Sequence, residues 1–169
     1  MEQETFTAFI ATHYPDGLVA GNHTPDGEAC VLEAWNAYQG HTWTDSPSIA
    51  DCWDIRPLND IEVPSAVRTP VMIRVMEAYA GSRSWPRARQ QAVSAQLVLG
   101  TVRELIAALP GLPAGVAARC RGVTTLAEAA EAAAEAAAEA VMPGTSQQSV
   151  FATACAVWLA AAETEEGQR

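Results

Sequence analysis

The sequence predicts an all-α fold, a compact single-domain bundle of about six or seven helices joined by short proline and glycine turns. Hydrophobic residues make up 49% of the 169 residues, and alanine supplies much of that share. Apolar residues recur at helical spacing, and no segment shows the sustained alternation of a strand. The length favours one domain over residues 1–169, with a motif-bearing helix–loop–helix at 21–60 and an alanine-rich helical scaffold at 70–165.

The first part of the chain is predicted to hold two helices. Residues 3–13 place their apolar side chains on one face, and a proline–glycine turn follows them. A second helix is expected from about residue 28 to residue 39. Asp26 is suited to cap its start, and Gly40 stands where a glycine commonly follows a helix.

Prolines set the predicted boundaries in the middle of the chain. A helix is expected over about 47–55, and Pro57 is expected to break it. The stretch 58–68 is predicted to be irregular, because Pro64 disfavours a regular helix there. The next helix is expected over 70–80, with a proline at its first position.

The remaining helices follow from caps and breaks. A long helix is expected over about 86–109, with a kink at Gly100. A short helix near 114–120 precedes an alanine-rich helix over about 125–142, which opens with a Thr-x-x-Glu capping box. A second capping box at 145–148 opens the last helix.

Composition limits the classes of function. The formal charge is −10, with 10 arginines, no lysine and 20 acidic residues. A negative surface disfavours nucleic-acid binding and permits a basic protein partner. The chain shows no secretion signal and no apolar run of membrane-spanning length, and its four cysteines form no Cys-x-x-Cys pair. We expect a cytoplasmic protein of bacterial or phage origin with reduced thiols and no membrane association.

Residues 21–60 hold most of the polar residues suited to chemistry. The recurring elements are Gly21-Asn22-His23, Gly27 to Ala34, Gly40, Thr44-Asp45-Ser46-Pro47 and Leu58-Asn59-Asp60. This pattern resembles a family of actinobacterial and phage hypothetical proteins, over about a quarter of the chain. The resemblance implies where a site lies, and it implies no mechanism.

One hypothesis for this stretch is a metal site. His23, Cys30 and Glu33 are permitted zinc or iron ligands, as are Asp45 and Cys52. None of the usual ligand spacings is present, so the expected cofactor is none and zinc is the alternative. In the competing interpretation, Cys30 is a small core residue, Glu33 accepts backbone N–H groups near His23, and His23 bridges to it.

A second hypothesis is a thiol enzyme centred on Cys30. In the first turn of the predicted helix, the helix dipole would lower the pKa of this thiol. His23 or His41 could act as its base and Asp45 could orient that base. The flanking sequence does not match papain-like enzymes, so a non-enzymatic role is preferred.

A third hypothesis is a contact surface on the loop 41–47. An aromatic residue in a polar loop is a better candidate for recognition than one on a core face. His41, Trp43 and Asp45 are therefore predicted to point outward and to bind a protein partner.

The only concentration of positive charge is at residues 81–89. Arg83 and Arg87 flank Trp85 near a predicted helix start, where the helix dipole disfavours cations. Such a group could bind an anion or stack on a base through Trp85. Otherwise the arginines pair with the chain's own carboxylates.

The alanine-rich helix carries an acidic stripe. Its glutamates recur three or four residues apart, and its other faces present methyl groups alone. Such a face could join copies in a homo-oligomer, although packing within the chain is favoured.

Taken together, these features predict a small acidic interaction or regulatory module that binds a protein through residues 21–60. The alternatives are a metal or thiol protein at Cys30 and a structural component of a virion or other assembly.

Overall fold

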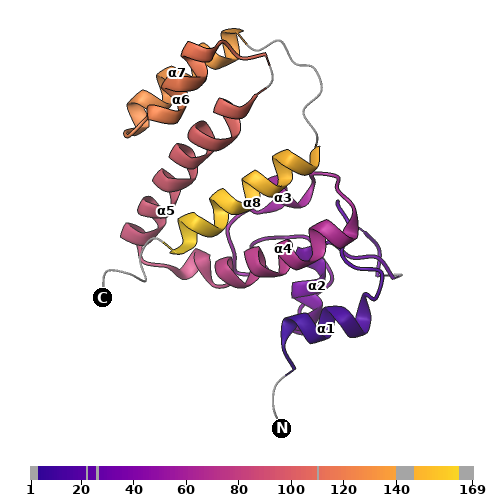
Figure 1. The fold of residues 1–169 in the computed structure, drawn as a ribbon. Helices are drawn as coiled ribbons and strands as arrows, with labels where there is room; N and C mark the ends of the chain where they lie inside the picture. Colours follow the sequence, from indigo (N-terminus) through magenta and orange to yellow (C-terminus); the bar gives the residue numbers. More distant parts are fainter. Residues whose placement is uncertain (1–3, 22, 26, 110, 140–146, 164–169) are drawn as a thin grey trace. The chain divides into compact units, whose positions relative to one another are not determined.

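The computed structural model describes residues 4–21, 23–25, 27–109, 111–139 and 147–163. These residues form eight α-helices and no strand, which confirms the predicted all-α fold (Figure 1). The helices are α1 (Phe6–His13), α2 (Val31–Tyr38), α3 (Arg56–Asn59), α4 (Ser65–Tyr79), α5 (Arg87–Gly100), α6 (Ala114–Gly122), α7 (Leu126–Glu139) and α8 (Gln147–Glu163). None of these described helices is both long and apolar enough to cross a lipid bilayer.

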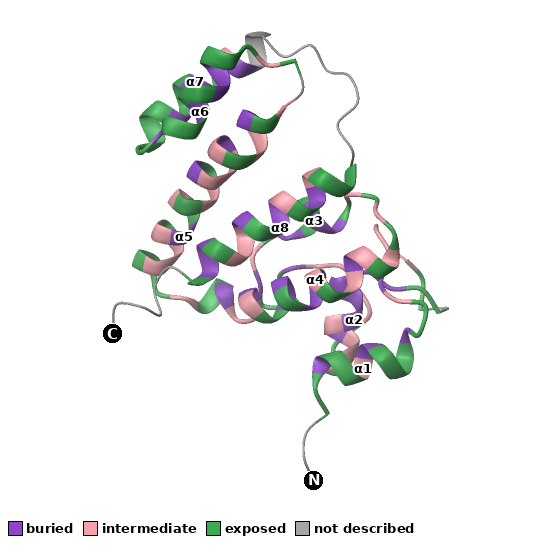
Figure 2. Cartoon of the chain, in the orientation of Figure 1, coloured by how far each residue is buried: buried purple, intermediate pink, exposed green. Residues whose placement is uncertain are grey.

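The chain divides into two compact units, Met1–Trp85 and Pro86–Arg169. Unit 1 contains α1 to α4, and unit 2 contains α5 to α8. Buried positions recur along the helices of both units, with exposed positions between them (Figure 2). A single domain over residues 1–169 stays a prediction.

In unit 1, α1 packs on α2 through aromatic side chains. α1 begins at Phe6 because Thr5 caps it, its hydroxyl accepting the backbone N–H of Ala8 at 3.2 Å. The ring centroid of Phe6 lies 4.9 Å from that of Trp35 and 5.3 Å from that of Tyr38. These edge-on and tilted contacts bury Phe6 and hold α1 against one side of α2.

The start of α2 differs from the prediction. The helix begins at Val31 rather than at about residue 28, and Cys30 is its N-cap in extended conformation. Glu33 closes a capping box by accepting the backbone N–H of Cys30 at 2.9 Å. Cys30 therefore precedes the first helical turn. Asp26, the predicted cap, lies outside the described residues.

The predicted helix over 47–55 is wrong. Residues 47–51 form consecutive turns, and Asp51 has a positive φ of 48°. A left-handed residue cannot continue a right-handed helix, so regular winding stops there. Helix α3 follows instead at Arg56–Asn59, and Pro57 lies in its first turn, where proline is tolerated, rather than breaking it.

α4 also begins earlier than predicted. It starts at Ser65, after Pro64 as N-cap, so much of the stretch predicted to be irregular up to residue 68 is helical. Pro70 lies inside the helix instead of at its first position. Proline in a helix removes one backbone hydrogen bond. Arg68, which is fully buried, joins the first part of α4 to the end of α3, because its guanidinium donates to the carbonyl of Asn59 at 2.6 Å.

A long-range contact fixes the turn between α1 and α2 on α4. The backbone N–H of Leu18 donates to the hydroxyl of Thr69 at 2.9 Å. Gly17 has a φ of 85°, and a Cβ at this position would lie 2.6 Å from the Thr69 hydroxyl. Glycine is required there for both reasons.

In unit 2, α5 and α8 approach closely at a glycine. Gly100 is the last residue of α5, and a π-helical segment, Thr101–Leu105, continues from it. A Cβ at Gly100 would lie 2.7 Å from Cγ1 of Val157 on α8. The helical winding thus changes at the residue where the sequence predicts a kink, and the absence of a side chain lets the two helices pack.

α6 and α7 pack through small side chains. The buried cluster that they form with the end of α5 and the segments after it comprises Leu99, Val102, Ala107, Val116, Cys120, Val123, Ala129, Ala132 and Ala136. The predicted capping box is confirmed, since Glu128 N–H donates to the Thr125 hydroxyl at 3.2 Å and Thr125 N–H donates to the Glu128 carboxylate at 3.0 Å. One alanine face of α7 is therefore used within unit 2. Residues 140–142 and Thr145, at the predicted helix end and second capping box, lie outside the described residues.

Candidate functional site

A buried carboxylate lies at the centre of residues 21–60. Glu33 is completely inaccessible to solvent. Its Oε1 accepts the backbone N–H of His23 at 2.6 Å, and its Oε2 accepts the backbone N–H of Cys30 at 2.9 Å. Oε2 also lies 3.1 Å from Nδ1 of the His23 ring. Glu33 thus satisfies several donors in the loop that precedes its own helix, as the competing interpretation of the sequence proposes.

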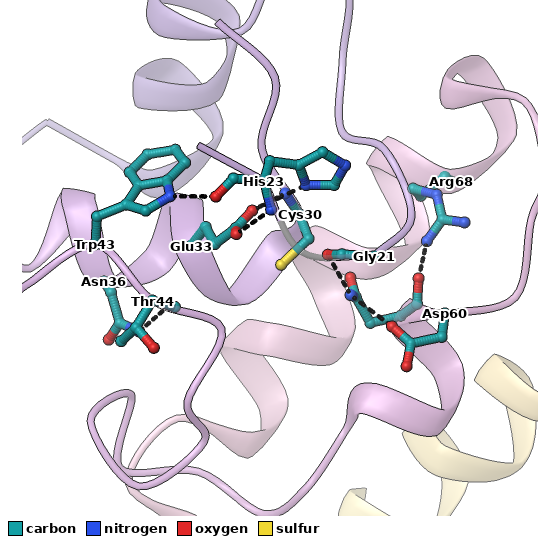
Figure 3. Close-up of polar contacts among 10 residues, drawn as sticks. Gly21, His23, Cys30, Glu33, Asn36, Trp43, Thr44, Asp60 and Arg68 are labelled. Atoms are coloured by element: carbon teal, nitrogen blue, oxygen red, sulfur yellow. Dashed lines mark hydrogen bonds and ion pairs between the residues drawn. The ribbon is translucent and has the colours of Figure 1, made fainter. Parts of the chain in front are cut away.

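His23 joins two loops to this carboxylate. Its backbone N–H and its ring face Glu33, while its backbone carbonyl accepts the indole N–H of Trp43 at 2.8 Å. The imidazole side chain is 17% exposed. Figure 3 shows Trp43 and Glu33 on either side of the His23 backbone. A residue of the first loop therefore stands between the buried face of α2 and the loop that follows α2.

Asn36 holds the second loop. It lies one turn after Glu33 on α2 and is also completely buried. Its side-chain amide donates to the carbonyl of Thr44 at 2.8 Å, and its backbone carbonyl accepts the N–H of His41 at 2.7 Å. Its side-chain oxygen lies 3.4 Å from Nδ1 of the His41 ring. Two buried polar residues at i and i+3 thus fasten the chain on both sides of α2.

The start of the loop that precedes α2 is held by residues that follow the loop 41–47 in the chain, Asn59 and Arg68. The Asn59 amide donates to the carbonyl of Gly21 at 3.4 Å and to the Asp60 carboxylate at 3.3 Å. Arg68 donates to the Asn59 carbonyl, and its second terminal nitrogen donates to the carbonyl of Ile61. Figure 3 places Gly21, Asp60 and Arg68 on one side of Cys30. The Leu-Asn-Asp element of the sequence is therefore a structural brace.

The thiols of this region are buried and protonated at neutral pH. Burial raises the pKa of Cys30 to about 12, with the nearby Glu33 charge acting in the same direction. Burial likewise raises the pKa of Cys52 to about 12, helped by the charges of Asp54 and Asp51. The prediction that the helix dipole lowers the pKa of Cys30 is therefore wrong, because desolvation of the thiolate outweighs the backbone N–H groups that favour it.

The structure brings together some of the residues predicted to bind a metal. The structure brings His23 and Glu33 into contact, and the backbone of Cys30 joins them. Within the described ranges, no group of three or more His, Cys, Asp or Glu side chains is placed to hold a metal ion. Zinc binding by His23, Cys30 and Glu33 stays a prediction.

The three residues predicted to point outward differ in exposure. His41 is exposed, whereas Trp43 and Asp45 are half-buried. The indole N–H of Trp43 is directed toward the carbonyl of His23, so only part of its half-buried side chain is presented outward, and its role in binding stays a prediction. The hydrogen bond of its indole N–H fixes the loop 41–47 to the backbone of His23. Ile49, which the sequence analysis did not single out, is 44% exposed and lies next to this loop.

The arginine-rich stretch spans the boundary between the units. Arg83 is exposed in a short 3-10 segment of unit 1, and Arg87 is the exposed first residue of α5 in unit 2. The ring of Trp85 lies 5.9 Å from that of Trp53 and 5.7 Å from that of Tyr79. Trp85 is half-buried in this aromatic cluster, so only part of its ring remains open for stacking. Anion or base binding there stays a prediction.

Sequence reasoning missed the role of Asn36. Its position three residues after Glu33 could have indicated it, since both side chains then lie on one helix face. A polar residue on an otherwise buried face requires a partner, and here the partners are in the following loop.

No family model, curated protein or solved structure matches this chain.

Proposed function

We propose that this chain is a non-enzymatic interaction module that binds a protein partner through residues 21–60. The surface we assign to the partner is the contact loop, residues 39–49. One observation carries the proposal. The contact loop has an irregular backbone, yet Asn36 and Trp43 fasten it through hydrogen bonds at 2.8 Å to Thr44 and His23.

Fastening an irregular loop favours recognition. A loop that is ordered before it binds loses little conformational entropy on association. Binding residues are often placed on loops held by a rigid scaffold. Here the scaffold is the buried face of α2, and the loop it holds exposes His41, Thr42 and Ile49.

The charge around the contact loop favours a basic partner. The exposed carboxylates of Asp51, Asp54 and Asp60 follow it in the chain. The one arginine between residues 39 and 60 is Arg56, which forms an ion pair with Asp54. This pairing lowers the pKa of Asp54, and the single positive charge of Arg56 cannot neutralise all the carboxylates of the segment. A partner with lysine or arginine on its surface complements this face.

The groups that could perform chemistry have other roles. Cys30 and Cys52 are buried with raised pKa values, so the fraction of reactive thiolate at neutral pH is small. Glu33 accepts donors from the backbone and the His23 ring. These arrangements support binding rather than turnover.

The test compares two exposed apolar residues in different units. Ile49 is 44% exposed at the end of the contact loop, and Leu126 is 50% exposed at the start of α7. A photo-crosslinking residue at His41 identifies the partner, with the same residue at exposed Ala130 as the reference position. The partner is then purified, and calorimetry measures its affinity. We expect Ile49→Ser to weaken binding about tenfold or more and Leu126→Ser to leave it unchanged.

Two results would count against the proposal. Equal labelling from positions 41 and 130 would show that the contact loop is not selective. Equal affinities of the Ile49→Ser and Leu126→Ser variants would place the interface elsewhere. A basic partner also predicts that the affinity falls as ionic strength rises from 50 to 300 mM, by about tenfold.

A further inference from the structure

We infer that the contact surface is composite, and that Glu33 positions it from inside the molecule. The second part of the surface is the leading loop, residues 23–25 and 27–30, which precedes α2. This inference rests on the proposed function for the identity of the surface. The hydrogen bonds that couple the two loops are independent of any partner.

The coupling runs through one residue. Glu33 accepts the backbone N–H of His23 at 2.6 Å, and the His23 carbonyl accepts the indole N–H of Trp43 at 2.8 Å. The backbone N–H and the backbone carbonyl of His23 thus link the buried carboxylate of Glu33 on α2 to the contact loop (Figure 3). A displacement of His23 changes the position of Trp43, because the indole edge has its partner on that backbone.

The same helix face holds the contact loop a second time. Asn36 binds the carbonyl of Thr44 and the N–H of His41. With Trp43 attached to His23, the leading loop, the contact loop and α2 form a closed ring of hydrogen bonds. Opening any member of such a ring weakens the others, because hydrogen-bonded networks act cooperatively.

The leading loop presents its own exposed residues beside the contact loop. Pro25 and Glu28 are exposed, whereas Ala29 and Cys30 are completely buried. The carboxylate of Glu28 extends the acidic character of the contact surface. Because the two loops are joined at Trp43 and His23, we expect a partner that touches His41 also to meet the leading loop. Glu33, which has no solvent-exposed atom, can act on that partner only by positioning both loops.

The deciding experiment measures amide hydrogen exchange by NMR on the purified chain alone. Glu33→Gln keeps the shape of the side chain and removes one acceptor oxygen and the charge. We expect exchange about tenfold or more faster at the amides of His23 and Cys30, and also at the amide of His41 and the indole of Trp43, although neither of the latter contacts Glu33.

Ser82→Ala is the matched control. Ser82 is also completely buried in unit 1, and its hydroxyl accepts one backbone N–H, that of Trp53, at 2.8 Å. This variant should accelerate exchange at Trp53 and leave His41 at the wild-type rate. Equal acceleration at His41 in both variants would mean general destabilisation and would overturn the positioning role.

A double substitution separates coupling from simple loss of stability. Trp43→Phe retains a large aromatic ring and removes the indole N–H. If Glu33 acts through His23 and Trp43, adding Glu33→Gln to Trp43→Phe produces no further acceleration at His41. Additive effects of the two substitutions at His41 would contradict the coupling.

Crosslinking tests the composite surface. A photo-crosslinking residue at Glu28 should label the same partner as one at His41, and one at Ala130 should not. Labelling from His41 without labelling from Glu28 would overturn the composite surface and leave the proposed function standing. Labelling from neither position would overturn both, while the exchange experiment still decides the positioning role of Glu33.

Discussion

The two units keep their backbones in place by different means. All the polar side chains that are fully or nearly fully buried in the described residues lie in unit 1, and they are Glu33, Asn36, Asn59, Arg68 and Ser82. Each of them binds backbone groups of a loop, a turn or a helix end. The described core of unit 2 consists of aliphatic side chains, cysteines and the aromatic ring of Phe151, nearly all of them on its helices.

The difference follows from where backbone hydrogen bonds are made. A helix satisfies its own N–H and C=O groups, so small apolar side chains are enough to pack it. An irregular loop leaves these groups without regular partners, and buried side chains must supply them. Unit 1 is therefore suited to holding a shaped surface, and unit 2 to close packing of helices.

The largest expected effect is the removal of the buried carboxylate from unit 1. Glu33→Ala leaves the N–H groups of His23 and Cys30 without their acceptor inside the protein. We expect a loss of about 4 kcal/mol in the free energy of unfolding of unit 1, measured by urea titration. Glu131→Ala, at an exposed position of α7, should leave the unfolding of unit 2 unchanged. Similar losses for the two variants would remove the distinction between the units.

A glycine substitution tests the packing of unit 2. Gly100→Ala places a methyl group 2.7 Å from Val157 and should lower the stability by about 2 kcal/mol through overpacking. Gly115→Ala on α6 meets no atom within 4 Å and should raise the stability by about 0.5–1 kcal/mol through helix propensity. Thermal unfolding gives the sign of both changes. Stabilisation by Gly100→Ala would show that α5 and α8 can move apart freely.

The pH dependence tests the burial of thiols in unit 1. The pKa values of Cys30 and Cys52 are about 12 in the folded state, against 9.0 for an unperturbed thiol. Between pH 9 and pH 12 the unfolded state loses protons that the folded state retains, so the stability contributed by the neutral thiols falls as pH rises. It is fully present below pH 9.

The expected slope is up to about 1.4 kcal/mol per pH unit for each thiol, measured by urea unfolding at pH 8 and pH 10. Cys30→Ser retains an N-cap side chain and removes one titrating thiol. It should make the decline shallower. An unchanged slope in Cys30→Ser would mean that the Cys30 thiol ionises equally in both states.

The smallest expected effect is on an exposed ion pair of unit 2. The side chains of Arg119 and Glu135 are 57% and 40% exposed. Arg119→Gln should lower the stability by less than about 1 kcal/mol, and 0.5 M NaCl should remove the difference. Differential scanning calorimetry with and without salt measures it. A larger, salt-independent loss would show that unit 2 also relies on polar contacts.

Local signals in the sequence predicted the helical fold and several of its boundaries. The capping box of Thr125 and Glu128 depends on residues three positions apart, so it could be identified from the sequence and is confirmed. The glycine at position 100 marked the change in winding for the same reason. Acceptance of the His23 N–H by Glu33 was also among the predicted alternatives.

Long-range contacts determined what the sequence did not predict. α4 begins at Ser65, before Pro70, and its first turns contain Arg68, whose partner is the carbonyl of Asn59 in another helix. The hydrogen bond that holds the indole of Trp43 was not predicted, because its partner is the carbonyl of His23, 20 residues away in sequence. Such partners depend on the folded chain and leave no signature in local spacing.

The bond between Leu18 and Thr69 bears on the order in which the protein folds during synthesis. Its two residues are separated by 51 positions, so the turn at Gly17 lacks its anchor until α4 has left the ribosome. Domains that emerge first generally fold first. Unit 1 ends at Trp85, so both residues of this bond belong to it. The nascent chain therefore carries an unfastened N-terminal turn throughout the synthesis of unit 1, and the anchor forms only once α4 has emerged.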